Sequence, residues 1–254
     1  MHKHLIINAR FGPTQRLGQA AYLKPPGSPG YLIDTGSSFH ARTVIRNLHK
    51  QGIDRLEGII ITHADLTHVG GLLEIVAALP PERIVLPVKM GKSKKVAEII
   101  ETLRETDIPI ETWQRGDVGE LCPGIRFRVY HPTPETDFGA ADDLSMILHL
   151  SHQRTAVLIT GGMGLRAEQD LFTSGQDPAA TVLVTPNYSN WESLSPATIN
   201  LIRPRDAIVA GSSFNITSGR INRLRDKDIN VFRVQDFGPV RVSFTGEWTR
   251  FLEE

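Results

Sequence analysis

The chain has 254 residues, 40% of them hydrophobic and 22% charged, and its 28 basic side chains equal its 28 acidic ones. Such a composition is typical of a packed globular protein and excludes long disordered tails, while a net charge of zero removes any bulk attraction to nucleic acid or membranes. Cys122 is the only cysteine, which excludes an internal disulfide and a zinc–thiolate cluster. The N-terminal residues do not resemble a secretory signal and the apolar runs are too short to span a bilayer, so we expect a soluble chain.

Short runs rich in β-branched residues, separated by Gly, Pro, Asp and Asn, predict strands along the whole chain. In chain order these runs are Leu5–Ile7, Ala20–Leu23, Tyr31–Ile33, Gly58–Thr62, Arg83–Leu86, Ile125–Tyr130, Met146–Leu150, Thr155–Thr160, Thr181–Val184, Asp206–Val209, Asn230–Val234 and Val240–Phe244. The run from Arg126 to Tyr130 alternates in polarity, as in a strand buried on one face, whereas Ala156–Ile159 is continuously apolar, which is typical of a central strand.

Segments with helical periodicity lie between these strands. They are Ala41–Gln51, Val69–Leu79, Lys92–Thr106, Gly164–Phe172, Ser195–Ile202 and Ser218–Lys227. No low-complexity tract or change in composition divides the chain, so we expect a single domain over residues 1–254, with two sheets packed together and helices outside.

The segment from Thr62 to Gly71 carries the clearest chemical signal. A buried strand ends at Thr62 and a helix is expected to begin near Val69, so that His63, Asp65 and His68 lie in the turn between them. Imidazole nitrogen and carboxylate oxygen are suitable ligands for zinc or manganese. Two glycines, at positions 70 and 71, would let the backbone pass close beneath such a site.

This loop resembles the ligand loop of the metallo-β-lactamase superfamily, His-x-His-x-Asp-His. It is more similar still to the soluble domain of the ComEC competence proteins, which carries Ser-His-x-Asp-x-Asp-His-x-Gly-Gly. Other segments before and after the loop also resemble the family and occur in its order: Leu32–Gly36, Leu48–Leu56, Ser145–Leu148, Leu158–Gly161 and Ile229–Val234. The resemblance implies an α/β fold, the four-layer αββα sandwich, and a place in DNA uptake, where intact relatives are thought to cleave phosphodiesters.

The chain departs from the family pattern at most of the remaining ligand positions. Thr67 stands where the family has an Asp, and Gly162 stands where the bridging Asp of Thr-Gly-Asp would be. Asn187 and Tyr188 replace the two histidines of a Pro-His-His-Gly-Ser turn. The resemblance assigns the first two loop positions to one metal and the final His to the other.

The ligands that remain are therefore His63 and Asp65 for the first metal and His68 alone for the second. A zinc site normally has at least three protein ligands. We therefore expect no bound cofactor, with one weakly held zinc or manganese on these three residues as the alternative.

Asp34 and a set of four lysines can each be interpreted either as structural or as functional residues. Asp34, in Leu-Ile-Asp-Thr-Gly, is expected to accept backbone N–H bonds and order the neighbouring loop rather than to bind a metal. Four lysines precede or begin the helix predicted from Lys92, and they form either a solvated helix start or a nucleic-acid patch: Lys89, Lys92, Lys94 and Lys95.

Three hypotheses for function follow. The first is a degenerate ComEC-like domain that has lost hydrolysis but serves DNA uptake, in contact with single-stranded DNA and a membrane channel. The second is a metal-dependent phosphodiesterase or nuclease with a reduced site on His63, Asp65 and His68. The third is a non-enzymatic interaction module. We expect a soluble domain, not secreted by a signal of its own, that is cytoplasmic or held at a membrane by a region absent from this sequence.

Overall fold

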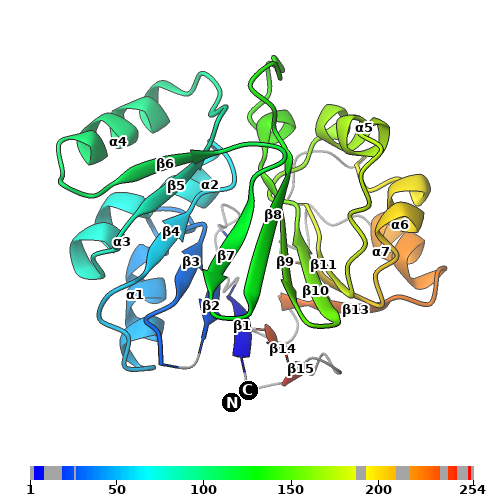
Figure 1. The fold of residues 1–254 in the computed structure, drawn as a ribbon, viewed down its shortest axis with the longest axis horizontal. Coiled ribbons are helices and arrows are strands. Elements are labelled where there is room, and N and C mark those ends of the chain that lie inside the picture. Colours follow the sequence, from blue (N-terminus) through cyan, green and yellow to red (C-terminus); the bar gives the residue numbers. More distant parts are fainter. Residues whose placement is uncertain are drawn as a thin grey trace.

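The computed structural model describes residues 3–8, 19–25, 27–186, 193–209, 218–234, 240–244 and 251–252 (Figure 1). Within these ranges, no helix has both the length and the apolar character needed to cross a lipid bilayer.

Two sheets lie face to face at the centre of the molecule (Figure 1). The first sheet has the order β15 (Phe251–Leu252), β14 (Val240–Phe244), β1 (Lys3–Asn8), β2 (Ala20–Lys24), β3 (Tyr31–Ile33), β4 (Gly58–Ile60), β5 (Ile84–Pro87) and β6 (Ile110–Trp113). The second has the order β13 (Asn230–Arg233), β12 (Asp206–Val209), β11 (Val182–Val184), β10 (Thr155–Ile159), β9 (Ile147–His152), β8 (Ile125–His131) and β7 (Val118–Cys122). A short 3₁₀ helix, η1 (Asp142–Leu144), precedes β9.

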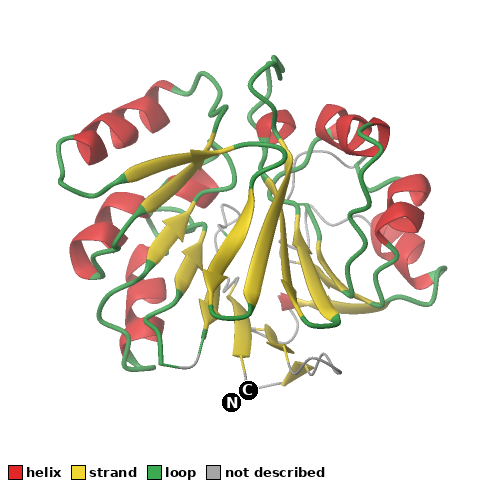
Figure 2. Ribbon diagram, in the orientation of Figure 1, coloured by secondary structure: helices red, strands yellow, loops and turns green. Residues whose placement is uncertain are grey.

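Helices cover the outer face of each sheet (Figure 2). The first sheet packs against α1 (Ala41–His49), α2 (Leu66–Val69), α3 (Leu72–Ala78) and α4 (Lys94–Arg104). The second packs against α5 (Leu165–Thr173), α6 (Pro196–Ile202) and α7 (Ser218–Arg225). The layers are therefore helices, sheet, sheet and helices, which confirms the predicted four-layer αββα sandwich.

The period of two along the central strands divides their side chains between these layers. Ile60 of β4 lies in the core between the two sheets, whereas Ile59 and Ile61 pack against the helices outside. In β10, Val157 and Ile159 face the other sheet. Strands of this kind are apolar on both faces because both faces are covered, which accounts for the continuous apolar runs in the sequence.

The sequence-based prediction differs from the structure in several places. The helix predicted over Val69–Leu79 is α3 (Leu72–Ala78), and a separate helix, α2 (Leu66–Val69), precedes it, with a break at Gly70 and Gly71. His68, expected in the turn after the strand, therefore lies in α2. That break lets the chain approach the loop after β3 closely, where the Gly71 N–H donates to the Gly36 carbonyl over 3.0 Å. Strands β6, β7 and β15 were not predicted. Most of β7 is exposed, so its sequence shows no apolar alternation.

Candidate metal centre

The predicted ligand loop lies at the carboxyl end of β4, where it meets the turn after β10 and the η1 helix. Parallel pairing of β3 with β4 and of β10 with β11 brings strand carboxyl ends to a common edge of each sheet. The two sheets are linked at this edge, because Met146 N–H donates to the carbonyl oxygen of Thr62 over 2.7 Å. The residue before His63 is therefore held by both halves of the sandwich.

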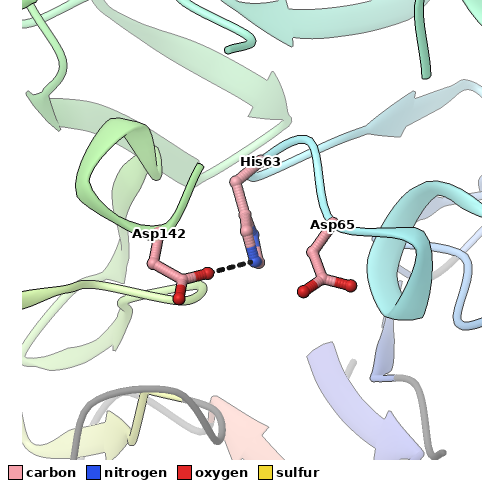
Figure 3. A group of neighbouring side chains, drawn as sticks. All are labelled: His63, Asp65 and Asp142. Carbon is pink, nitrogen blue, oxygen red and sulfur yellow. Dashed lines mark ion pairs between the residues drawn. The ribbon is translucent and has the colours of Figure 1, made fainter. Parts of the chain in front are cut away.

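Three side chains meet at this edge with atoms that can bind a metal (Figure 3). One ligand atom from each of His63, Asp65 and Asp142 lies within 4.8 Å of the other two. The His63 ring lies between the two carboxylates, and its Nε2 is 3.7 Å from Oδ1 of Asp142. Among the residues that the structure describes, no other group of three His, Cys, Asp or Glu side chains is this close.

The orientation of His63 is fixed from behind by a relay of hydrogen bonds. Thr62 Oγ1 donates to Oδ2 of Asp34 over 2.8 Å and lies 2.9 Å from Nδ1 of His63. A hydroxyl has one hydrogen, so when Asp34 is ionised the Oγ1 that donates to its carboxylate accepts from Nδ1–H. Nε2 then carries no proton and presents its lone pair to the two carboxylates, and a second partner of this kind is typical of metal-binding histidines.

Burial controls the charge of both ends of this relay. His63 is 1% exposed, and burial lowers its pKa to about 4, an effect that the Asp65 carboxylate only partly opposes. Burial also raises the pKa of the Asp34 carboxyl to about 7, against the hydrogen bonds from Thr62. The backbone N–H of Thr62 donates to Oδ1 of Asp34 over 2.7 Å, which confirms the predicted loop-ordering role of Asp34.

Thr67 cannot contribute an anionic ligand; instead it contacts two of the predicted ligands, Asp65 and His68. Its backbone N–H and hydroxyl both donate to Oδ1 of Asp65, over 2.7 and 2.9 Å, so Asp65 caps α2. The same hydroxyl lies 3.0 Å from Nδ1 of His68. The ring centroid of His68 is 4.1 Å from that of His63, so His68 packs against the site without joining its group of ligand atoms.

Gly162 closes the site from the opposite side. A Cβ atom at this position would lie 2.6 Å from Nε2 of His63 and 2.9 Å from Oδ1 of Asp142. These distances are well below van der Waals contact, so the space of a side chain at position 162 is taken by the imidazole and by Asp142. The position that the resemblance gives to a bridging aspartate thus holds only backbone.

Asp142 is the member of the group that the sequence analysis missed. Its backbone carbonyl accepts from Ser145 N–H and Gly164 N–H, each over 3.2 Å. The adjacent Asp143 accepts from Arg166 N–H over 2.9 Å at the start of α5. These bonds hold η1 against the turn after β10. The only sequence signal was an acidic pair just before the family-like Ser145–Leu148 strand.

The donor set fits one divalent cation. One imidazole nitrogen and two carboxylate oxygens from three side chains are what a catalytic or exchangeable zinc or manganese site requires. A second ion is not supported by the described residues, because Thr67 is neutral and Gly162 has no side chain. Asn187 and Tyr188, predicted as altered ligand positions, lie outside the described residues.

Three further histidines pair with backbone carbonyl groups away from this site. Nδ1 of His131 pairs with the Ser145 carbonyl at 2.7 Å, Nε2 of His149 with the Ala179 carbonyl at 3.1 Å, and Nδ1 of His152 with the Gly124 carbonyl at 2.5 Å. None belongs to the group around His63.

The predicted lysine patch is only partly continuous with this site. Lys92, Lys94 and Lys95 are exposed and Lys89 is half-buried. Lys94 pairs with Glu98 on the same helix at 4.0 Å. Lys95 lines a surface hollow of about 430 Å³ together with Phe39 and Thr67, and this hollow borders the ligand loop; the other three lysines do not line it.

The fold agrees with what comparison with known proteins finds. Residues 15–212 match the model of the metallo-β-lactamase superfamily, and the chain belongs to that superfamily. It is similar to ComE operon protein 3 of Bacillus subtilis, with 24% identity over 247 residues that cover 91% of this chain and 31% of that protein. It is also similar to competence protein ComA of Neisseria gonorrhoeae, with 24% identity over 220 residues, 83% of this chain and 28% of the relative.

The chain therefore spans about a third or less of the length of these relatives. Among solved structures, zinc-bound PqqB from Methylobacterium extorquens superimposes with a TM-score of 0.58 at 14% identity, covering 91% of this chain and 97% of that one. At this identity the likeness concerns the fold alone.

Proposed function

We propose that this chain is a metallo-β-lactamase-fold domain of the DNA-uptake type that handles DNA without the two-metal hydrolysis of its superfamily. Its similarity to competence proteins over most of its length supports the place in DNA uptake. The loss of hydrolysis is our inference from the site.

The position of Gly162 carries this proposal. A two-metal centre needs a bridging ligand between its ions, and the resemblance places that ligand at residue 162. Here the backbone at 162 lies so close to His63 that even a Cβ would be 2.6 Å from Nε2. Thr67, at the other altered position, uses its hydroxyl to bind Asp65. Without the second ion, a phosphodiester lacks one of the two cations that stabilise the attacking and leaving oxygens.

The contact with DNA is assigned to the hollow beside the ligand loop. Phe39 is 86% exposed there, and Leu66, Leu73 and Lys95 line the same hollow. An exposed aromatic ring next to a lysine is suited to stack on an unpaired base and to neutralise its phosphate. Single-stranded DNA is therefore the partner we propose. A membrane channel protein remains the second proposed partner, in line with the length of the relatives beyond the matched region.

Two measurements test this proposal. Cleavage of labelled single- and double-stranded DNA is assayed with added Mn²⁺ or Zn²⁺, for the wild type and for His63→Ala. We expect no cleavage that depends on His63. Binding to a single-stranded oligonucleotide is measured by fluorescence anisotropy at low and moderate salt; we expect Lys95→Glu to weaken it more than Lys94→Glu, which changes the net charge equally. Equal effects of the two variants would argue against the hollow as the DNA contact, and no binding at low salt together with no cleavage would leave only the interaction-module hypothesis.

A hydrolase with a reduced, one-ion site is the second candidate. The observation that favours it is the meeting of His63, Asp65 and Asp142, which are enough to hold one cation with a position open to water. Cleavage that disappears in both His63→Ala and Asp142→Asn would establish this candidate and refute the first.

A further inference from the structure

The three ligand atoms around His63 are spaced as ligands of one ion are. Two atoms that each lie about 2.1 Å from a zinc ion are about 3–4 Å apart. Nε2 of His63 and Oδ1 of Asp142 are 3.7 Å apart, too far for a hydrogen bond and within that range. Asp65 completes a triangle with no side longer than 4.8 Å.

The chemistry of the facing atoms also favours a cation. His63 is 1% exposed, and with Nδ1–H given to Thr62 its Nε2 is an acceptor. Oδ1 of Asp65 is bound by Thr67, and no described residue donates to its Oδ2. A buried lone pair that faces two carboxylates is unfavourable unless a positive charge lies between them. A divalent ion would balance the two carboxylates and satisfy the imidazole.

Asp142 lies where a ligand from the turn after β10 would lie, although it comes from the η1 loop. A Cβ at residue 162 would lie 2.9 Å from Oδ1 of Asp142, so this carboxylate occupies the space that a side chain at 162 would need. The η1 loop is held there by the bond from Gly162 N–H to the Ser145 hydroxyl, over 3.1 Å. The carboxylate missing after β10 is thus supplied from in front of β9.

We propose that Asp142 is the third protein ligand, with His63 and Asp65, of a site for a single divalent cation in this chain. This inference is independent of hydrolysis, because a domain can hold one cation and still lack the second ion of a two-metal hydrolase. It differs from our expectation in one respect: the proposed set of three ligands is completed by Asp142 rather than by His68.

The test is metal binding to protein first freed of metal by a chelator. Zn²⁺ and Mn²⁺ are titrated separately into the wild type, Asp142→Asn and Asp137→Asn, and binding is followed by calorimetry and by the rise in Tm. Asp137 is an exposed carboxylate in the same segment before β9, so it controls for the loss of one charge near the site. Far-UV circular dichroism and the metal-free Tm establish that each variant is folded, and Asp142→Ala serves as a second variant.

We expect one ion per chain in the wild type and in Asp137→Asn. In Asp142→Asn the affinity is expected to fall by at least about tenfold and the rise in Tm to disappear. One ion bound to Asp142→Asn with wild-type affinity would overturn the assignment, as would two ions, or none, in the wild type. Binding of one ion without DNA cleavage supports this inference and leaves the proposed function intact, so the two can fail separately.

Discussion

Replacement of Gly162 by alanine tests how tightly the turn after β10 closes on the candidate site. The added Cβ would lie 2.6 Å from Nε2 of His63 and 2.9 Å from Oδ1 of Asp142. The imidazole cannot easily move, because Nδ1 is 2.9 Å from Thr62 Oγ1 and the ring packs against His68 with centroids 4.1 Å apart. Overpacking of this kind costs about 1–3 kcal/mol, which for a chain of this size lowers Tm by roughly 2–4 °C per kcal/mol.

Urea unfolding of Gly162→Ala against the wild type, both free of metal, measures this cost. Gly139→Ala is the matched control, since a Cβ there meets nothing within 4 Å, and we expect its stability to stay within about 0.5 kcal/mol of the wild type. Gly162→Asp, which restores the residue of the family pattern, should be at least as destabilising as the alanine. If Gly162→Ala unfolds at the same urea concentration as the control, the turn has room for a side chain and our reason for the loss of the second ion is wrong.

Three further predictions concern the ligand loop, the surface hollow and acid stability. Thr67→Asp should not confer DNA cleavage with Mn²⁺, since it adds a carboxylate beside Asp65 while position 162 remains blocked; cleavage by this single variant would contradict our account of the site. Phe39→Ala should weaken single-stranded DNA binding by about 1–3 kcal/mol in an anisotropy titration, whereas Phe172→Ala, also exposed but on α5, should not, and an equal loss in both would argue against the hollow. The metal-free protein should be less stable near pH 5 than near pH 7. Below about pH 6.5, histidines whose pKa is lowered in the fold bind more protons in the unfolded chain than in the folded one, an effect that the raised pKa of Asp34 partly offsets; a urea midpoint that is unchanged or higher near pH 5 would refute this prediction. The buried histidines concerned are His63, His68, His131 and His149.

Much of the fold could be predicted because its signals are local. Ile59–Ile61 is apolar at every position and ends in a polar turn, which is enough to place a buried strand and its loop. Helix α4 begins at Lys94, two residues later than its apolar pattern suggests, because the Ser93 hydroxyl accepts from Val96 N–H and caps it. By contrast, β7 is defined by pairing with β8 and has three exposed residues at its start, so its sequence alone does not reveal it.

The candidate site was only half predictable for the same reason. His63 and Asp65 are two residues apart, and a strand end followed by a tight turn brings them together. Asp142 reaches them from a distant segment, through contacts of η1 with the turn after β10. A motif in the sequence shows that a ligand is missing. It does not show that a residue from a distant loop takes the place of that ligand, because this depends on tertiary packing, here the packing of Asp142 against Gly162.

Thr62 gives this arrangement a mechanical property. Its carbonyl accepts from Met146 N–H on the second half of the molecule, while its amide and hydroxyl are tied to Asp34 on the first. Any sliding of one sheet over the other would pull on the residue directly bonded to His63 and would change the distance from that imidazole to Asp142. A partner that binds the outer helices of either half could therefore change the affinity of the site for a cation without contacting the ligands.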